Sequence, residues 1–311
     1  MAASKLMLWG RLLYLYIRFS LFGAFSACGF LSYFVGFCHW KTDKRTAYNP
    51  GMEIMNRYVP KEYLALKINY CKKCLNEIPD YSVADRIKRG KLRKVIKANN
   101  HEYFLDSKLG KEYLKNMHKR KQTECQLKIY ETIWSCHFND EPLPECMPHK
   151  VIRTLRIDTD KHVVMDKAFF DSLKNDDNSK YIKYKSNYFN GIYYRSAAER
   201  DIAIFYTYLG IPFKYEPSIM LAGLYKPVNP DFIIYIEELD TCFIHEHFGM
   251  KESSDYLTTT KVKYSNYTNA GLIPDLDILF THDTGEMPFD IRFLSAKLNA
   301  AIYCKTIAFP V

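Results

Sequence analysis

The stretch Pro230–Phe248 reads "PDFIIYIEELDTCFIHEHF" and decides the fold of the C-terminal part of the chain. Two runs rich in isoleucine, phenylalanine and tyrosine flank a polar segment, Glu237–Asp240. Apolar runs of this composition, bounded by polar residues, are typical of strands joined by a turn. The stretch predicts an antiparallel hairpin with Asp231 at the start of its first strand and Glu246 near the end of its second.

The symmetry of this hairpin brings the two carboxylates together. With the turn centred between Glu238 and Leu239, Asp231 and Glu246 each lie seven and a half residues from the centre. Directly opposed residues point to one face of a sheet, with Cβ atoms ~4.5–5.5 Å apart. Two such acids on an apolar sheet repel each other, so one is protonated or a cation offsets them. The plainer alternative is a pair of strand-end acids that face solvent.

The flanking sequence supplies the other elements of a mixed α/β unit. A helix is predicted over residues 196–210, with Ser196 as its N-cap and Gly210 at its end. The remaining elements are expected as a strand at 211–221, a second helix at 253–271 and a last strand at 276–282. The predicted order is therefore helix, three strands, helix, strand.

Glu199 lies in the first turn of the first helix, and two roles compete for it. A glutamate at this position can reach back to the N-cap, here Ser196, and close a capping box. It could instead join Asp231 and Glu246 around a divalent cation, because Mg²⁺ accepts carboxylate oxygens and completes its shell with waters. The sequence leaves both roles open.

These residues resemble a known family. "RSxxE" at 195–199, "YE" at 215–216, "PDF" at 230–232 and "EHFG" at 246–249 follow one another in this order. The segment from about residue 191 to residue 284 resembles the PD-(D/E)xK nuclease superfamily, the restriction-endonuclease-like fold, in its branch with a Glu-His-Phe-Gly strand. The resemblance implies metal-dependent phosphodiester hydrolysis, with Asp231 and Glu246 as ligands of Mg²⁺ or Mn²⁺ and Glu199 as auxiliary acid.

The basic member of the motif departs from the family's plain pattern. Phe248 stands where the lysine is expected, two residues after Glu246. In the similar branch the following helix supplies the lysine, which implies Lys263 here, with Lys261 as second choice. Arg195 is expected to hold a substrate phosphate or to pair with an acid. If neither lysine reaches the site, a protein that binds nucleic acid without cutting it is expected.

The two histidines that flank Glu246 point to the other face of the sheet, because side chains alternate along a strand. His245 and His247 could form a His-x-His metal pair. No third ligand is evident in the sequence, so we expect both to pack or to contact helices.

The N-terminal segment, residues 1–51, differs sharply in composition from the rest. Residues 19–38 hold no charged side chain and are long enough to cross a membrane as a helix. Three interpretations stay open: a membrane anchor, which is favoured, a cleaved signal peptide, and translation that begins at Met52. Three basic residues precede the segment and three follow it, so charge does not indicate its orientation.

Residues 52–178 are predicted to form a mainly helical basic region, and residues 179–311 the nuclease-like domain. Apolar spacing indicates helices over much of 52–133. The run at 85–100, "DRIKRGKLRKVIKANN", is either a solvated helix face or a surface that contacts phosphates. The chain's net charge of +9 suits a polyanionic partner.

Nine scattered cysteines do not form a secreted disulfide pattern, so a reducing compartment, the cytoplasm, is expected for the part of the chain after residue 50. A structural Zn²⁺ held by Cys71, Cys74, Cys146 and His149 is a minor alternative to buried thiols.

The sequence as a whole predicts a nuclease that acts on DNA. Its rivals are a non-catalytic nucleic-acid-binding protein on a degenerate nuclease fold and a membrane-tethered accessory protein in which residues 1–45 matter most. The sequence predicts no oligomeric state.

Overall fold

The structure is a computed structural model that describes residues 59–308, except 89, 99, 250–253 and 284–287. The hydrophobic segment at 19–38, and with it the question of a start at Met52, lies outside these residues. Within the described part of the chain, no helix has the length and apolar character needed to cross a membrane. The described residues fall into two compact units, 64–148 and 149–308 together with 59–63.

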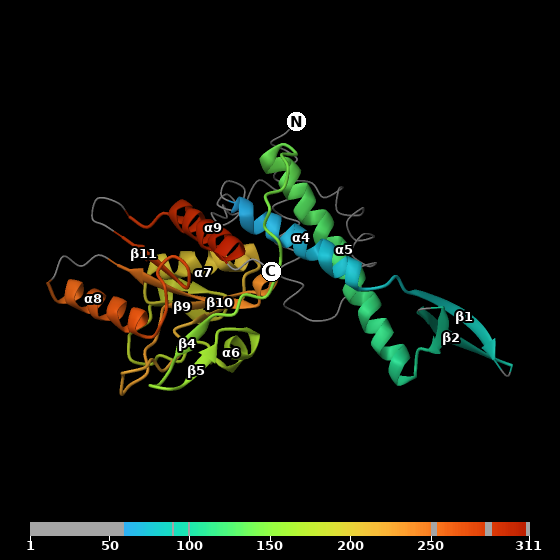
Figure 1. The fold of residues 1–311 in the computed structure, drawn as a ribbon, viewed down its shortest axis with the longest axis horizontal. Coiled ribbons are helices and arrows are strands. Elements are labelled where there is room, and N and C mark those ends of the chain that lie inside the picture. Colours follow the sequence, from blue (N-terminus) through green and yellow to red (C-terminus); the bar gives the residue numbers. More distant parts are fainter. Residues whose placement is uncertain (1–58, 89, 99, 250–253, 284–287, 309–311) are drawn as a thin grey trace. The chain divides into compact units, whose positions relative to one another are not determined.

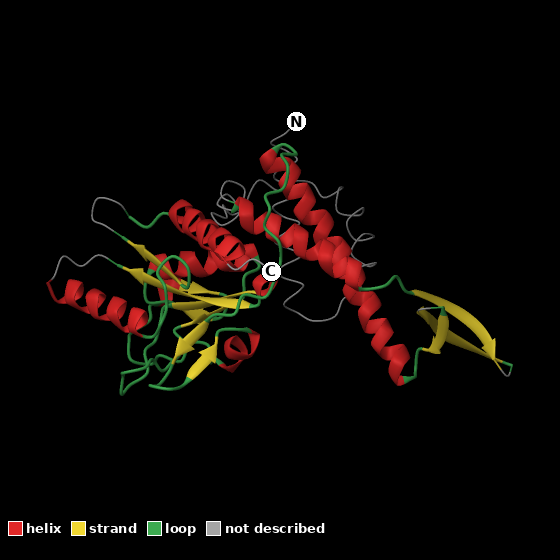
Figure 2. Ribbon diagram, in the orientation of Figure 1, coloured by secondary structure: helices red, strands yellow, loops and turns green. Residues whose placement is uncertain are grey.

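The first unit combines two helices with a small antiparallel sheet (Figures 1 and 2). Its elements are α4 (Lys61–Glu77), β1 (Ser82–Lys88), β2 (Lys91–Ala98), β3 (His101–Phe104) and α5 (Lys108–Phe138), of which the first residues of α4 belong to the other unit. The expectation of a mainly helical region is confirmed for α4 and α5 but wrong between them. Gly90 and Asn100 have positive φ values of 72° and 63° and make the two turns, so the basic run folds as strands.

The second unit is built on a four-stranded sheet in the order β11-β10-β9-β8. The predicted order of helix, three strands, helix and strand is found from α7 to β11. Its parts are α7 (Ala197–Leu209), β8 (Phe213–Tyr215), β9 (Phe232–Ile236), β10 (Thr241–Phe248), α8 (Ser254–Asn269) and β11 (Ile278–His282). The elements around them are β4 (Thr154–Arg156), β5 (His162–Val164), α6 (Lys167–Ser172), β6 (Tyr188–Phe189), β7 (Ile192–Tyr193) and α9 (Ile291–Ala308), with short 3-10 turns at Lys185–Asn187 and Glu237–Leu239.

The hairpin has the predicted register. Thr241 pairs with Ile236 and His245 pairs with Phe232, so the turn is centred between residues 238 and 239. One further step of this ladder places Glu246 opposite Asp231. Because β9 and β10 are antiparallel, Asp231 before β9 and Glu246 near the end of β10 lie at the same end of the sheet. The strand β11 pairs in parallel on the other side of β10.

The strand predicted at 211–221 is shorter than expected. β8 ends at Tyr215, because Glu216 adopts a positive φ of 42° and turns the chain. Ile219 then forms only an isolated bridge with Val228.

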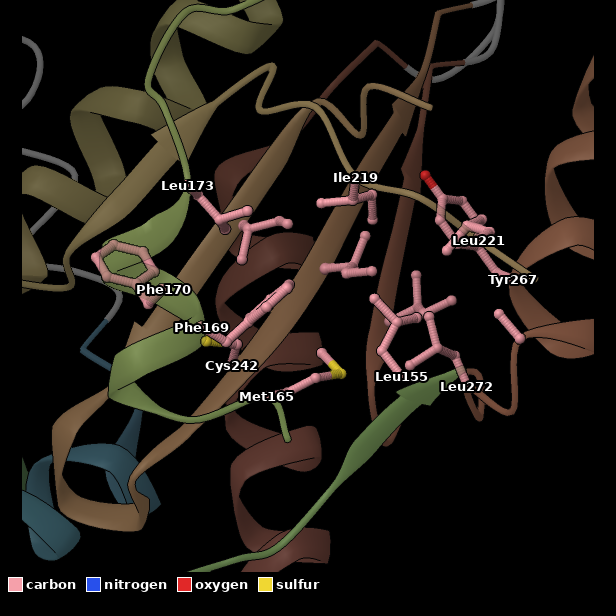
Figure 3. Packing of buried hydrophobic residues seen from close by; sticks show 14 of the residues in the cluster. Leu155, Met165, Phe169, Phe170, Leu173, Ile219, Leu221, Cys242, Tyr267 and Leu272 are labelled. Carbon is pink, nitrogen blue, oxygen red and sulfur yellow. The ribbon is translucent and has the colours of Figure 1, made fainter. Parts of the chain in front are cut away.

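Helices cover both faces of the sheet. On one face, Tyr206 of α7 contacts His245 and Lys305 of α9 lies over the ring of Phe243. The other face carries a core into which α6, α8 and β4 pack (Figure 3). This core includes Leu155, Met165 and Phe169, so the second unit extends further toward the N-terminus than the boundary predicted at 178–179.

Candidate functional site

The predicted helix at the start of the site has the expected caps. The hydroxyl of Ser196 accepts a hydrogen bond from the backbone N–H of Glu199 at 3.1 Å, and Gly210 ends α7 in the left-handed conformation. These caps fix the first turn of α7, which carries Glu199 on the side of the helix that is buried.

Asp231 and Glu246 lie side by side at the end of the central strands, and both are buried. One carboxylate oxygen of Asp231 accepts a hydrogen bond from the backbone N–H of His247 at 2.7 Å. This bond crosses between the strands and holds Asp231 beside Glu246. The solvent-facing alternative for the two acids is therefore wrong.

Glu246 is held from α8 by two side chains one helical turn apart. The ammonium of Lys263 lies 2.7 Å from Oε2 of Glu246, and the hydroxyl of Tyr267 donates to Oε1. Positions i and i+4 share one face of a helix, which is why both reach the same carboxylate. Lys261, the second choice, is exposed, and no described contact joins it to the three acids. Of the two lysines, the structure thus brings Lys263 to the site.

The protonation of this pair reflects its burial. Burial raises the pKa of Glu246 to about 7, and the neighbouring Asp231 acts in the same direction, against Lys263 and Tyr267. Burial disfavours the charge of Lys263, but Glu246 and Asp231 outweigh it and raise the pKa of the amine. Lys263 therefore stays an ammonium at neutral pH, while Glu246 titrates there.

Arg195 pairs with acids, one of the two roles that the sequence left open. One of its guanidinium nitrogens, Nη2, lies 2.6 Å from Asp231 and 3.2 Å from Glu199. Its Nε lies 3.0 Å from Glu216. A single guanidinium thus links the acid of α7 to the acid at the start of β9.

Glu199 does not close a capping box to Ser196. Its Oε2 accepts from the backbone N–H of Arg195 at 3.1 Å and from the hydroxyl of Tyr215 at 2.7 Å. Burial raises the pKa of Glu199, and repulsion from Asp231 adds to this, while Arg195 opposes it. Glu199 is therefore turned toward Asp231 and shares its cation.

Glu216 is a residue of the site to which sequence reasoning gave no role. It is buried, its Oε1 accepts from Asn178 at 3.1 Å, and its Oε2 pairs with Lys183 at 3.0 Å. It also holds Arg195, through the guanidinium Nε. The signal in the sequence was the "YE" pair at 215–216, whose tyrosine and glutamate both contact this network.

The histidines lie on the opposite face of the sheet, as predicted. His245 is buried between the hydroxyls of Tyr206 and Thr281, at 2.7 Å and 2.8 Å from its two ring nitrogens. His247 also contacts Thr281, at 2.9 Å. Burial lowers the pKa of both imidazoles. Both are therefore neutral packing residues at neutral pH.

The donor chemistry of the site fits a hard divalent cation. Asp231 and Glu246 offer carboxylate oxygens from adjacent positions, the ligands that Mg²⁺ takes while keeping several waters. In the structure these oxygens face Arg195 and Lys263, and no group of three or more His, Cys, Asp or Glu side chains among the described residues is arranged around one metal position. The same holds for the zinc alternative, since Cys71, Cys74, Cys146 and His149 form no such group.

Comparison with known proteins adds no relative. No family model, curated protein or solved structure matches the chain. The resemblance to the PD-(D/E)xK superfamily therefore stays a prediction from the motifs and their order.

Proposed function

We propose that the chain is a Mg²⁺- or Mn²⁺-dependent nuclease that hydrolyses phosphodiester bonds in DNA, on a restriction-endonuclease-like domain. One observation carries the proposal. Three buried carboxylates from separate elements, Glu199, Asp231 and Glu246, lie close enough to couple electrostatically and share two cations, Arg195 and Lys263. A cluster with more buried acids than cations gains stability from one more positive charge.

Asp231 and Glu246 would hold the metal, with Glu199 as the auxiliary acid. When bound, the metal lowers the pKa of a water and stabilises negative charge on the phosphate. The chain's own side chains set the geometry. Tyr267 and Lys263 fix the orientation of Glu246, and the backbone N–H of His247 fixes Asp231.

Lys263 is the residue through which the chain itself contributes positive charge near a substrate. Its ammonium is a compact charge with three donors, and Glu246 takes one of them. About a third of the side chain (36%) is exposed, so Lys263 is not closed off from solvent. It can therefore stabilise a phosphate oxygen while it stays beside Glu246.

The direct test is cleavage of plasmid and linear DNA by the full chain in Mn²⁺. We expect cleavage by the wild type, and its loss on chelation and in Asp231→Ala. Asp201→Ala is the matched control, because Asp201 is a half-exposed carboxylate of α7 that pairs with Arg200 outside the site. Cleavage that persists in Asp231→Ala refutes the assignment.

A second candidate is a nucleic-acid-binding protein without catalysis. Its support is the guanidinium of Arg195, which takes up the oxygens of Asp231 that a metal would need. Binding that a chelator leaves unchanged, with no product in any divalent metal, would establish it.

We further propose a cytoplasmic location, with membrane association through 19–38 as a separate element. Fractionation of cells that express a tagged full chain tests both. Recovery in the membrane pellet at high salt indicates an anchor, and recovery in the supernatant contradicts it.

A further inference from the structure

The outer parts of β1 and β2 extend beyond the residues that pair with β3 and form a two-stranded ribbon with one strongly basic face. Arg86 pairs with Arg93 and Lys88 pairs with Lys91 across the strands. Because side chains alternate along a strand, these four residues lie on the same face. All four are exposed.

This arrangement is unfavourable in the isolated chain. Like charges directly opposite each other on neighbouring strands destabilise a sheet. Among the described residues of this face, the carboxylate of Glu102 pairs with Arg86 at 2.7 Å and lies 3.9 Å from Lys97. Lys88 and Arg93 lie over the ring of Phe104 instead, at 4.9 Å and 5.2 Å from its centroid. The face therefore keeps a surplus of positive charge that a polyanion would neutralise.

The opposite face of the ribbon changes character along its length. Near α5, Ile96 and Ala98 are buried in a small core with Met117. At the outer end, Ile87 and Leu92 form a cross-strand pair and are 79% and 70% exposed. The ribbon is thus anchored to α5 at its base, while its outer end extends away from that helix (Figure 1).

We infer that this ribbon binds duplex DNA by entering the major groove. The groove is ~12 Å wide and admits a two-stranded β-ribbon. Arg86, Lys88, Lys91 and Arg93 would contact the phosphates and base edges of the groove, while Ile87 and Leu92 on the opposite face would point away from the DNA. The choice of DNA among polyanions rests on the proposed function, but the binding itself does not require catalysis.

Duplex DNA fits this shape better than other nucleic acids. The major groove of duplex RNA is deep and narrow and does not admit side chains readily. Single strands are bound mainly by stacking on aromatic rings, and Phe104 is already covered by Lys88 and Arg93. The four exposed cations on one face of a narrow ribbon instead match a groove with phosphates on both sides.

The test is binding of the full chain to a short DNA duplex in a chelator, followed by fluorescence anisotropy over a series of salt concentrations. Neutralising the basic face with Arg86→Gln, Lys88→Gln, Lys91→Gln and Arg93→Gln together should lower the magnitude of the slope of log affinity against log salt by about 3 to 4. The affinity at physiological salt should fall by roughly 100-fold or more.

The matched control neutralises four exposed lysines of α5 in the same unit: Lys111→Gln, Lys115→Gln, Lys119→Gln and Lys121→Gln. This variant has the same net charge as the ribbon variant and should keep most of the wild-type slope. Equal losses in both variants would show that net charge alone drives binding, which overturns the inference. So would equal affinity of the wild type for duplex RNA.

The apolar pair has its own variant, Ile87→Ser with Leu92→Ser. It should leave both the affinity and the salt slope close to those of the wild type, because the pair lies on the face away from the groove and carries no charge. A loss of affinity of about 10-fold or more would show that the ribbon meets DNA through its apolar face, which overturns the inference that the basic face enters the groove. Because binding is measured without metal, loss of cleavage in Asp231→Ala tests the proposed function and leaves this result unaffected.

Discussion

The two ends of the central strand β10 both bury charged side chains, but they balance them in opposite ways. Beside the first residues of β10, one carboxylate, Asp277, lies between two cations. Arg153 makes a bidentate pair with it at 2.9 Å and 2.6 Å, and Lys305 lies 3.4 Å away. At the other end, the three acids Glu199, Asp231 and Glu246 share two cations.

The direction of the pKa shifts follows this balance. Burial raises the pKa of Asp277, but Arg153 and Lys305 outweigh it, so the pKa is lowered. Burial likewise raises the pKa of Glu246, and here the neighbouring acid adds to it. A buried acid with enough cations is already neutralised, whereas a buried acid in excess would gain stability from a further cation. Four substitutions test this difference.

The largest effect is expected at the end that holds Asp277. Asp277→Asn leaves Arg153 and Lys305 with no carboxylate between them, and removing one partner of a buried pair costs about 3–5 kcal/mol. The free energy of unfolding from urea denaturation should fall by this amount. A loss below about 1 kcal/mol would show that the two ends do not differ as described.

For the proposed nuclease, Lys263→Met should lower the rate of cleavage more than it lowers stability. Loss of the ammonium should slow Mn²⁺-dependent DNA cleavage by roughly 100-fold, as removal of one preorganised donor does in other enzymes. Lys261→Met is the control, because Lys261 is exposed on the same helix. Equal cleavage rates in the two variants would show that Lys263 has no role in the reaction.

Glu246→Gln should abolish cleavage and yet stabilise the fold at pH 8. The native state keeps the Glu246 proton up to a pKa of about 7, whereas the unfolded chain loses it near 4.5. The native state thus binds more protons between these values, so the free energy of unfolding falls as pH rises through this window. Glu246→Gln has no group that titrates at this position, so its free energy of unfolding does not fall over this window. It should therefore be about 1–3 kcal/mol more stable than the wild type at pH 8.

Urea denaturation at pH 5.5 and pH 8 measures this difference. Asp240→Asn is a control of opposite sign, because the pKa of Asp240 is lowered, against burial, by Lys150 and Tyr235. A Glu246→Gln variant that is less stable than the wild type at pH 8 would mean that the acid is not in excess.

The smallest effect is expected for Lys305→Met. Burial lowers the pKa of Lys305 to about 8, against the attraction of Asp277. Between this pH and 10.5 the unfolded chain binds the proton more strongly, so the wild type gains stability as pH rises. The variant should lose this gain, by about 1 kcal/mol between pH 8 and pH 9. Thermal unfolding at the two pH values, compared with Lys297→Met on the same helix, checks it.

The hairpin and the carboxylate pair were predictable from the sequence because they follow from local rules. The strand period and the position of the turn fix the register, and the register alone places Asp231 opposite Glu246. The choice of Lys263 came instead from the resemblance, and the structure places it four residues before Tyr267 on one face of α8.

Other parts of the molecule depend on contacts that no local rule describes. Arg195 pairs with Glu216, where the chain turns with a positive φ. The residues around Glu216 in the sequence do not predict this turn. The strands β1 and β2 were missed because charged residues lie on both of their faces, as Lys94 and Arg93 show, so the apolar period of two is hidden. Residues 149–178 belong to the second unit through short elements with few apolar residues each.

Tyr267 connects the core of the second unit to the proposed site. Its ring belongs to the buried cluster below the sheet, near Leu221 and Leu272, while its hydroxyl lies on Glu246 (Figure 3). Substitutions at position 267 are therefore constrained in two ways, by the volume of the ring in the core and by the hydroxyl that bonds Glu246. Phenylalanine would keep the ring volume but lose the hydroxyl, and a smaller polar residue would keep a polar atom but leave the core underfilled. Changes in the core and changes at the proposed site are therefore linked at this position.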